Sequence, residues 1–178
     1  MSKIMGVDPS LTATGFYVLD TDILTNNIYG EIKSNEKGIK RLLEIEEKIE
    51  DELFIKIDLV VMERYIYFPT SGASIGNIEL GAILKRLFYK QEIPLILVAP
   101  TTLKKFITGS GKSPKNEILK RAYQKWNIDL GEHITEAFAL AKIGEMITKK
   151  DDKQYVDGLK QYEREVLEVF RNLLFYSG

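Results

Sequence analysis

The sequence predicts an α/β domain in which helices flank a mixed five-stranded sheet. Three segments with strand character come first, at 3–7, 14–19 and 28–32, separated by short connections. Helical patterns then alternate with two more apolar segments, at 57–62 and 94–99. Closely spaced strands favour antiparallel pairing and strands separated by helices favour parallel pairing, so one sheet should contain both.

Each expected strand has its own signal. The first is an apolar run that stops at Asp8-Pro9, and Asn26-Asn27 marks the turn between the second and the third. The fourth, at 57–62, is almost wholly apolar, which is typical of a strand covered on both faces. The fifth, at 94–99, is a short apolar run of the same kind.

Helices are expected where apolar residues recur every three or four positions: 36–54, 74–89, 100–107, 114–126, 132–147 and 155–176. Pro114 suits the first turn of its helix, with Ser113 as the cap. A polar linker at 151–153 precedes the last helix, so we expect a main domain over 1–150 and a helical extension over 151–178. We expect that extension to pack on the domain or on the dimer, and its wide apolar stripe favours its own domain over a seam between subunits.

Composition excludes several classes of function. The chain has 178 residues and no cysteine, which rules out disulfides, thiolate zinc sites and cysteine nucleophiles. No apolar run approaches the length of a membrane span and no signal peptide precedes the first strand, so we expect a cytoplasmic protein. The net charge of -1 hides a block at 81–125 with 10 basic and 2 acidic residues. This block indicates either a surface that faces a polyanion or a solvated lysine-rich face.

Three acidic residues that are far apart in the sequence stand at the ends of expected elements. Asp8 ends the first strand, Glu63 ends the fourth, and Glu136 lies near the start of the helix at 132–147. A carboxylate at the tip of a buried strand is costly unless something uses it. Carboxylates that converge on one edge of a sheet make a site for hard divalent cations, as in metal-dependent phosphodiesterases.

This order of elements resembles the ribonuclease H-like superfamily, and within it the RuvC family of Holliday junction resolvases. The resemblance covers about residues 3–145. It is carried by Ile-Met-Gly-Val-Asp-Pro-Ser at 4–10 with Thr14-Gly15, by Glu63, by the basic stretch 100–115, and by Glu136 before the alanine-rich residues 137–141. It implies that 1–150 is a ribonuclease H-like nuclease domain.

The resemblance also implies an activity and a metal site. The activity is a crossover junction endonuclease for Holliday junctions and other branched DNA, in recombination, repair or replication in a bacterium or phage-infected cell. Two Mg²⁺ ions, with Mn²⁺ as a substitute, would be bridged by Asp8 and held by Glu63 and Glu136. His133 stands where the family carries an aspartate or a histidine, so it is expected to bind metal or orient the attacking water. Glu132, four residues before Glu136 and on the same helix face as Glu136, competes for the role.

The partners implied are branched DNA and a second copy of the chain. Contacts to DNA phosphates are expected from Lys104, Lys105, Lys112 and Lys115. The loop after Glu63 occupies the place of the family's aromatic wedge, and its candidates for base stacking or core packing are Tyr65, Ile66, Tyr67 and Phe68. The helix at 74–89 is apolar on more than one face and is expected to form the homodimer surface.

Two other functions compete with junction cleavage. One is a ribonuclease H-like nuclease that acts on RNA–DNA hybrids, and the other is a non-catalytic protein that binds branched DNA. Intact acidic residues at 8, 63 and 136 argue against the non-catalytic reading. The weak overall charge and Ile66 in place of an aromatic wedge favour a broader substrate range, including three-way forks.

Overall fold

The computed structural model describes residues 2–21, 27–65 and 73–171. Its sheet has the strand order β3-β2-β1-β4-β5. β1 runs antiparallel to β2 and parallel to β4, which confirms the mixed five-stranded sheet expected from the sequence. The strands are β1 (Lys3–Asp8), β2 (Thr14–Asp20), β3 (Ile28–Ile32), β4 (Leu59–Glu63) and β5 (Leu95–Val98).

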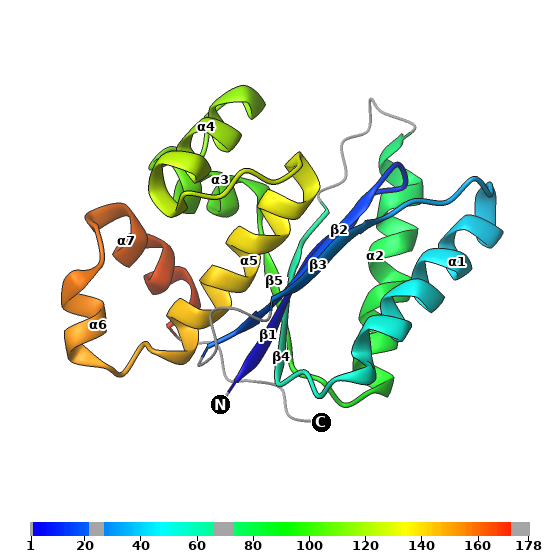
Figure 1. Ribbon diagram of the computed structural model, residues 1–178, viewed down its shortest axis with the longest axis horizontal. Coiled ribbons are helices and arrows are strands. Elements are labelled where there is room, and N and C mark those ends of the chain that lie inside the picture. The colour runs from blue at the N-terminus through cyan, green and yellow to red at the C-terminus, as the bar shows by residue number, and fades with distance from the viewer. Residues whose placement is uncertain (1, 22–26, 66–72, 172–178) are drawn as a thin grey trace.

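Helices cover both faces of the sheet (Figure 1). α1 and α2 lie on one face, and α5 crosses the other with α3, α4, α6 and α7 beyond it. A short 3₁₀ turn, η1 (Glu52–Phe54), follows α1. The helices are α1 (Gly38–Asp51), α2 (Ala73–Lys90), α3 (Pro100–Thr108), α4 (Lys115–Trp126), α5 (Glu132–Thr148), α6 (Lys153–Gly158) and α7 (Gln161–Phe170). Within the described part of the chain, no helix is long and apolar enough to cross a membrane.

The expectation of a single final helix at 155–176 is wrong. The chain forms α6 and α7 instead, with extended backbone at Leu159 and Lys160 between them. Asp152 starts α6 by accepting a hydrogen bond from the Tyr155 N–H (3.1 Å), and Glu163 accepts one from the Lys160 N–H (2.7 Å) at the start of α7. These two hydrogen bonds cap helix starts within a segment whose apolar residues follow one continuous helical pattern.

The expected cap of α4 is also wrong. Pro114 occupies the position before the first helical residue, with extended backbone, and makes no side-chain cap. The Ser113 hydroxyl donates instead to Thr108 Oγ1 (2.8 Å), so it closes the connection back onto the end of α3. Gly109 ends α3 with a φ of 87°, a conformation that favours glycine.

Strand alternation decides which side chains reach α5. In β1, Met5 and Val7 belong to the apolar layer under α1 and α2, whereas Ile4 belongs to the layer under α5. Because successive side chains point to opposite faces, Gly6 and Asp8 also face α5. The same parity in β4 places Leu59 and Val61 in the layer under α5, so Glu63 shares that face.

Two glycines allow α5 to approach the sheet very closely. A Cβ on Gly6 would lie 1.9 Å from the carbonyl oxygen of Ala137, and one on Gly15 would lie 2.2 Å from that of His133. Gly15 is the register partner of Asp8 across β1 and β2. The absence of these two side chains therefore lets the first turns of α5 lie directly over the end of β1.

We expect Gly6→Ala to destabilise the fold by about 3 kcal/mol, because the new methyl group overlaps backbone that a helix cannot move locally. Urea unfolding followed by circular dichroism measures this change. Gly158→Ala is the matched control, since an added Cβ there meets nothing within 4 Å. Equal stability of the two variants would show that α5 does not depend on close contact with β1.

Candidate metal centre

The acidic residues at the ends of β1 and β4 lie side by side. Val7 pairs with Met62 in the parallel ladder, so Asp8 and Glu63 occupy the next position of neighbouring strands. Asp8 is buried, with 4% of its surface exposed. The sequence order of these strands says nothing about their adjacency, which the parallel pairing of β1 with β4 creates.

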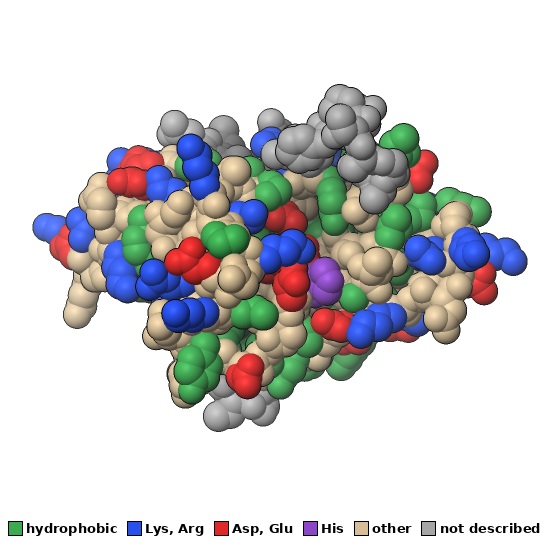
Figure 2. All heavy atoms as spheres, turned by 90° about the horizontal axis from the view of Figure 1, so that it is seen from above, with side chains coloured by type: hydrophobic (Ala, Val, Ile, Leu, Met, Phe, Trp, Pro, Cys, Tyr) green, Lys and Arg blue, Asp and Glu red, His purple; other side chains and the backbone are tan. Residues whose placement is uncertain are grey.

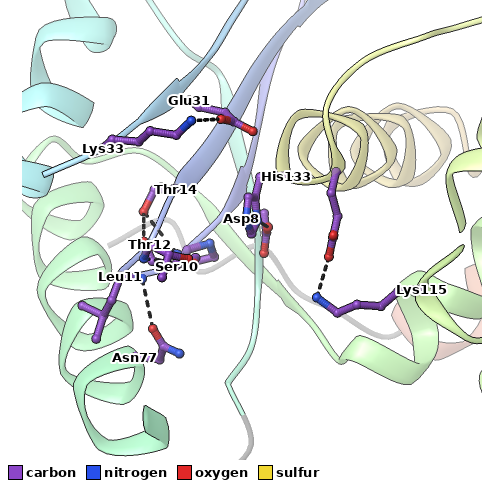
Figure 3. Close-up of polar contacts among 12 residues, drawn as sticks. Asp8, Ser10, Leu11, Thr12, Thr14, Glu31, Lys33, Asn77, Lys115 and His133 are labelled. Atoms are coloured by element: carbon purple, nitrogen blue, oxygen red, sulfur yellow. Dashed lines mark hydrogen bonds and ion pairs between the residues drawn. The ribbon is translucent and has the colours of Figure 1, made fainter.

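The first turns of α5 bring two more candidate ligands to this point. One ligand atom each from Asp8, His133 and Glu136 lies within 4.8 Å of the other two. His133 Nδ1 lies 2.7 Å from Asp8 Oδ2 (Figure 3). This hydrogen bond, opposed by burial and supported by nearby carboxylates, raises the pKa of His133. Carboxylate oxygens and an imidazole nitrogen at this spacing suit a divalent cation.

The electrostatics of the centre also fit a cation. Burial raises the pKa of Glu63 to about 9, and the charges of Asp8 and Glu136 and a hydrogen bond with Asp8 add to the effect. Burial, Asp8 and Glu132 raise the pKa of Glu136 to about 7. Carboxylates that are difficult to ionise alone become stable anions when a metal ion supplies opposite charge.

Glu132, the alternative to His133, lies differently. Its Oε1 atom accepts a hydrogen bond at 2.5 Å from Nζ of Lys115, the first residue of α4. Glu132 therefore forms an ion pair with a lysine, whereas His133 contacts Asp8. This arrangement favours His133 over Glu132 as the fourth member of the centre.

The four lysines expected to bind DNA are in different environments. Lys105 is paired with Glu165 of α7 (2.6 Å), and Lys115 is paired with Glu132. Lys104 lies close enough to lower the pKa of Glu63 by its charge, although burial dominates that group. Lys112 is exposed in the connection between α3 and α4. Figure 2 shows basic side chains beside the acidic group and the chain's single histidine on this face.

Only part of the expected aromatic loop can be placed. Tyr65 is partly buried, and its hydroxyl donates to the carbonyl oxygen of Pro9 at 2.5 Å. Ile66, Tyr67 and Phe68 lie outside the described residues. Base stacking or core packing was expected of Tyr65, and its hydrogen bond to Pro9 was not. Its position two residues beyond a strand that ends in a carboxylate was the available signal.

Curated proteins with similar sequences are junction endonucleases by name. The chain is 22% identical over 156 residues to the crossover junction endodeoxyribonuclease RuvC of Synechococcus sp. (strain CC9311), covering 80% of this chain and 97% of that protein. It is 30% identical over 122 residues to the RuvC of Thermobifida fusca, covering 65% of this chain and 67% of that protein. No family model matches the chain.

A solved structure shows the same fold. Thermus thermophilus RuvC aligns with a TM-score of 0.66 and 16% identity, over 84% of this chain and 96% of that one. The same protein in complex with Holliday junction substrate aligns with a TM-score of 0.60 and 15% identity, over 79% and 90% of the two chains. The ribonuclease H-like arrangement expected from the sequence is thereby confirmed.

We expect the metal-free protein to lose stability as the pH rises from about 5 to about 9. Glu63 and Glu136 have raised pKa values in the fold, so the native state holds more protons than the unfolded chain in this window. The free energy of unfolding should therefore fall, by a few kcal/mol in all. Urea unfolding in EDTA at several pH values measures it.

Glu63→Gln is the informative variant for this prediction. It removes the group with the higher pKa, so the decline above about pH 7 should become shallower. Saturating Mg²⁺ should reduce the decline in the unmodified chain, because metal stabilises the ionised carboxylates. Stability that rises with pH in EDTA would contradict the electrostatics described for the centre.

Proposed function

The chain belongs to the RuvC family of crossover junction endodeoxyribonucleases, and from this premise we propose that it cleaves Holliday junctions and other branched DNA. The single observation that carries the proposal is the cluster of Asp8, His133 and Glu136 beside Glu63, at one edge of a ribonuclease H-like sheet. Buried carboxylates that converge in this way favour a catalytic site over a purely binding role.

These four side chains would together bind two Mg²⁺ ions, for which Mn²⁺ could substitute. Asp8 contacts both His133 and Glu63 and would bridge the ions, with Glu63 as a ligand from β4 and His133 and Glu136 as ligands from α5. Such ions supply an activated water and stabilise the leaving oxygen of a phosphodiester. The rigid strand ends and the first turns of α5 keep the four ligands in place.

Lysines around the centre would hold the DNA backbone. Lys104 and Lys112 are the main candidates, and phosphate would compete with Glu132 for Lys115. Lys105 contributes less in this proposal because Glu165 already pairs with it. Contacts of this kind bind any sequence and weaken with salt, so selectivity must come from the branched shape.

A second copy of the chain would place a second centre opposite the first. α2 exposes Ile75 and Ile78, and α1 exposes Ile39 and Leu43 next to it. A groove of about 550 Å³ lies between these two helices. We propose that this apolar face forms a two-fold homodimer, so that two strands of one junction can be cut in one complex.

The test is cleavage of a labelled four-way junction in Mg²⁺ or Mn²⁺, beside a fork, a linear duplex and an RNA–DNA hybrid. We expect paired nicks near the branch point, and a loss of at least about a thousandfold in rate in Asp8→Asn because a central metal ligand is gone. Asp157→Asn is the matched control, since it makes the same chemical change on the exposed surface of α6.

Each other outcome selects a different function. Preferred cleavage of the hybrid would favour a ribonuclease, and tight junction binding without cleavage in either metal would favour a binding protein. Equal cleavage of linear and branched DNA would contradict structure selectivity.

We expect Lys112→Ala to weaken junction binding and to reduce the slope of log affinity against log salt by about 1, as for one lost phosphate contact. Lys105→Ala should change the slope much less, because that lysine is paired with Glu165. Fluorescence anisotropy with the cleavage-deficient Asp8→Asn protein measures both slopes. A larger effect at Lys105 than at Lys112 would reverse this assignment.

A further inference from the structure

The turn that follows Asp8 is tied to two other elements. The Tyr65 hydroxyl donates to the carbonyl oxygen of Pro9 at 2.5 Å. The Leu11 N–H donates to Oδ1 of Asn77, on α2, at 3.2 Å (Figure 3). Pro9 directly follows Asp8 and Tyr65 lies two residues beyond Glu63, so the first of these hydrogen bonds joins the ends of the two strands that carry the carboxylates.

The turn itself is a closed unit. The Ser10 N–H donates to Thr14 Oγ1 (3.2 Å), and the same hydroxyl donates to the Ser10 carbonyl oxygen (2.9 Å). Thr14 is fully buried. The Leu11 side chain rests on Gly76 of α2, where a Cβ would lie 2.6 Å from Leu11 Cδ1. The turn is therefore rigid, so the positions of Pro9 and Leu11 determine the position of the end of β1.

The end of β1 needs such support. The register of β1 with β4 is recorded as far as Val7 and Met62, one residue short of the carboxylates. Beyond that pair, the side chains of Asp8 and Glu63 lie in hydrogen-bond contact, with no ladder pair between the two strands to fix their separation. On its other side, β4 is hydrogen-bonded to β5 beyond Glu63, where the Arg64 N–H donates to the Val98 carbonyl oxygen (2.7 Å). β1 is held at Asp8 by its pairing with Gly15 of β2, so what the β1–β4 ladder leaves unfixed is the separation of Asp8 from Glu63.

We propose that Tyr65 and Asn77 are positioning residues that fix Asp8 against Glu63 and so set the affinity of the centre for metal. The inference rests on the proposed function, because it requires that these carboxylates bind the ions. Neither side chain touches an ion or the DNA in this account. Tyr65 acts through the Pro9 carbonyl and Asn77 through the Leu11 N–H, each on the backbone next to Asp8. Residues that orient metal ligands without touching the metal change metal affinity by about ten- to a hundredfold in other proteins.

The test is Mn²⁺ binding to the full chain without DNA, measured from the free-ion signal in electron paramagnetic resonance. We expect Tyr65→Phe to weaken Mn²⁺ binding about tenfold, because the ring remains and only the hydroxyl is lost. Tyr29→Phe is the matched control, since Tyr29 lies 49% exposed on the edge strand β3. A purely structural role would lower the unfolding temperature and leave the Mn²⁺ affinity unchanged.

Asn77 provides an independent test of the same inference. Asn77→Leu removes the acceptor for the Leu11 N–H at similar size and should also weaken Mn²⁺ binding about tenfold. Asn77→Asp keeps an acceptor oxygen and should restore the affinity. Cleavage rates at saturating Mn²⁺ should recover in Tyr65→Phe and Asn77→Leu, so the defect appears in the metal concentration required and not in the maximal rate.

The outcomes separate this inference from the function on which it rests. If the unmodified chain binds Mn²⁺ no better than Asp8→Asn, the metal centre itself is overturned and the inference falls with it. If the unmodified chain binds Mn²⁺ and Asp8→Asn does not, the centre stands. Unchanged affinity in Tyr65→Phe and Asn77→Leu would then overturn the positioning role alone.

Discussion

The close approach of α5 to β1 and β2 is the constraint on which the rest of this structure depends. At Gly6 and Gly15 there is no room for even one carbon atom between strand and helix backbone. This contact sets the height of α5 above the sheet, and hence where its first turns lie relative to the end of β1. His133 can reach the Asp8 carboxylate, and Glu136 can join them, because the helix backbone lies so low. A larger residue at either glycine would separate the two halves of the centre.

The centre combines a strongly unfavourable charge arrangement with a rigid frame. Burial and mutual repulsion raise the pKa of both Glu63 and Glu136, so these groups hold their protons more tightly when no cation is bound. Apolar layers on both faces of the sheet stabilise the frame against this repulsion. A basic border that includes Lys104 and Lys115 then makes the neighbourhood attractive to a polyanion. A metal ion would thus neutralise the carboxylates, and DNA phosphates would neutralise the lysines around them.

The C-terminal helices connect to this border. Glu163 of α7 pairs with Lys125 of α4 at 2.7 Å, with both side chains nearly buried, and Lys125 also lies 4.1 Å from the centre of the Phe106 ring. Burial lowers the pKa of Lys125, although the ion pair opposes that effect. Through these contacts and the pair of Lys105 with Glu165, α7 holds α3 and α4 together. The segment therefore stabilises the elements that flank the basic connection, and it uses one of the lysines in doing so.

The strands, most helices, the mixed sheet and the acidic residues at the strand ends are predictable from the amino-acid sequence, because hydrophobic period and turn residues are local signals. It could not determine that α6 and α7 are separate, since a cap at Glu163 competes with an apolar stripe that continues across it. Nor could it choose between His133 and Glu132, because one lies three and the other four residues before Glu136 and both spacings bring a side chain close to it.

The partners of His133, Glu132, Tyr65 and Lys105 follow from the packing of the folded chain. Each of these contacts joins residues remote in the sequence, so the outcome depends on how closely the elements pack and not on the local pattern. A charged or hydroxyl group has several possible partners in a folded chain, and geometry selects one of them.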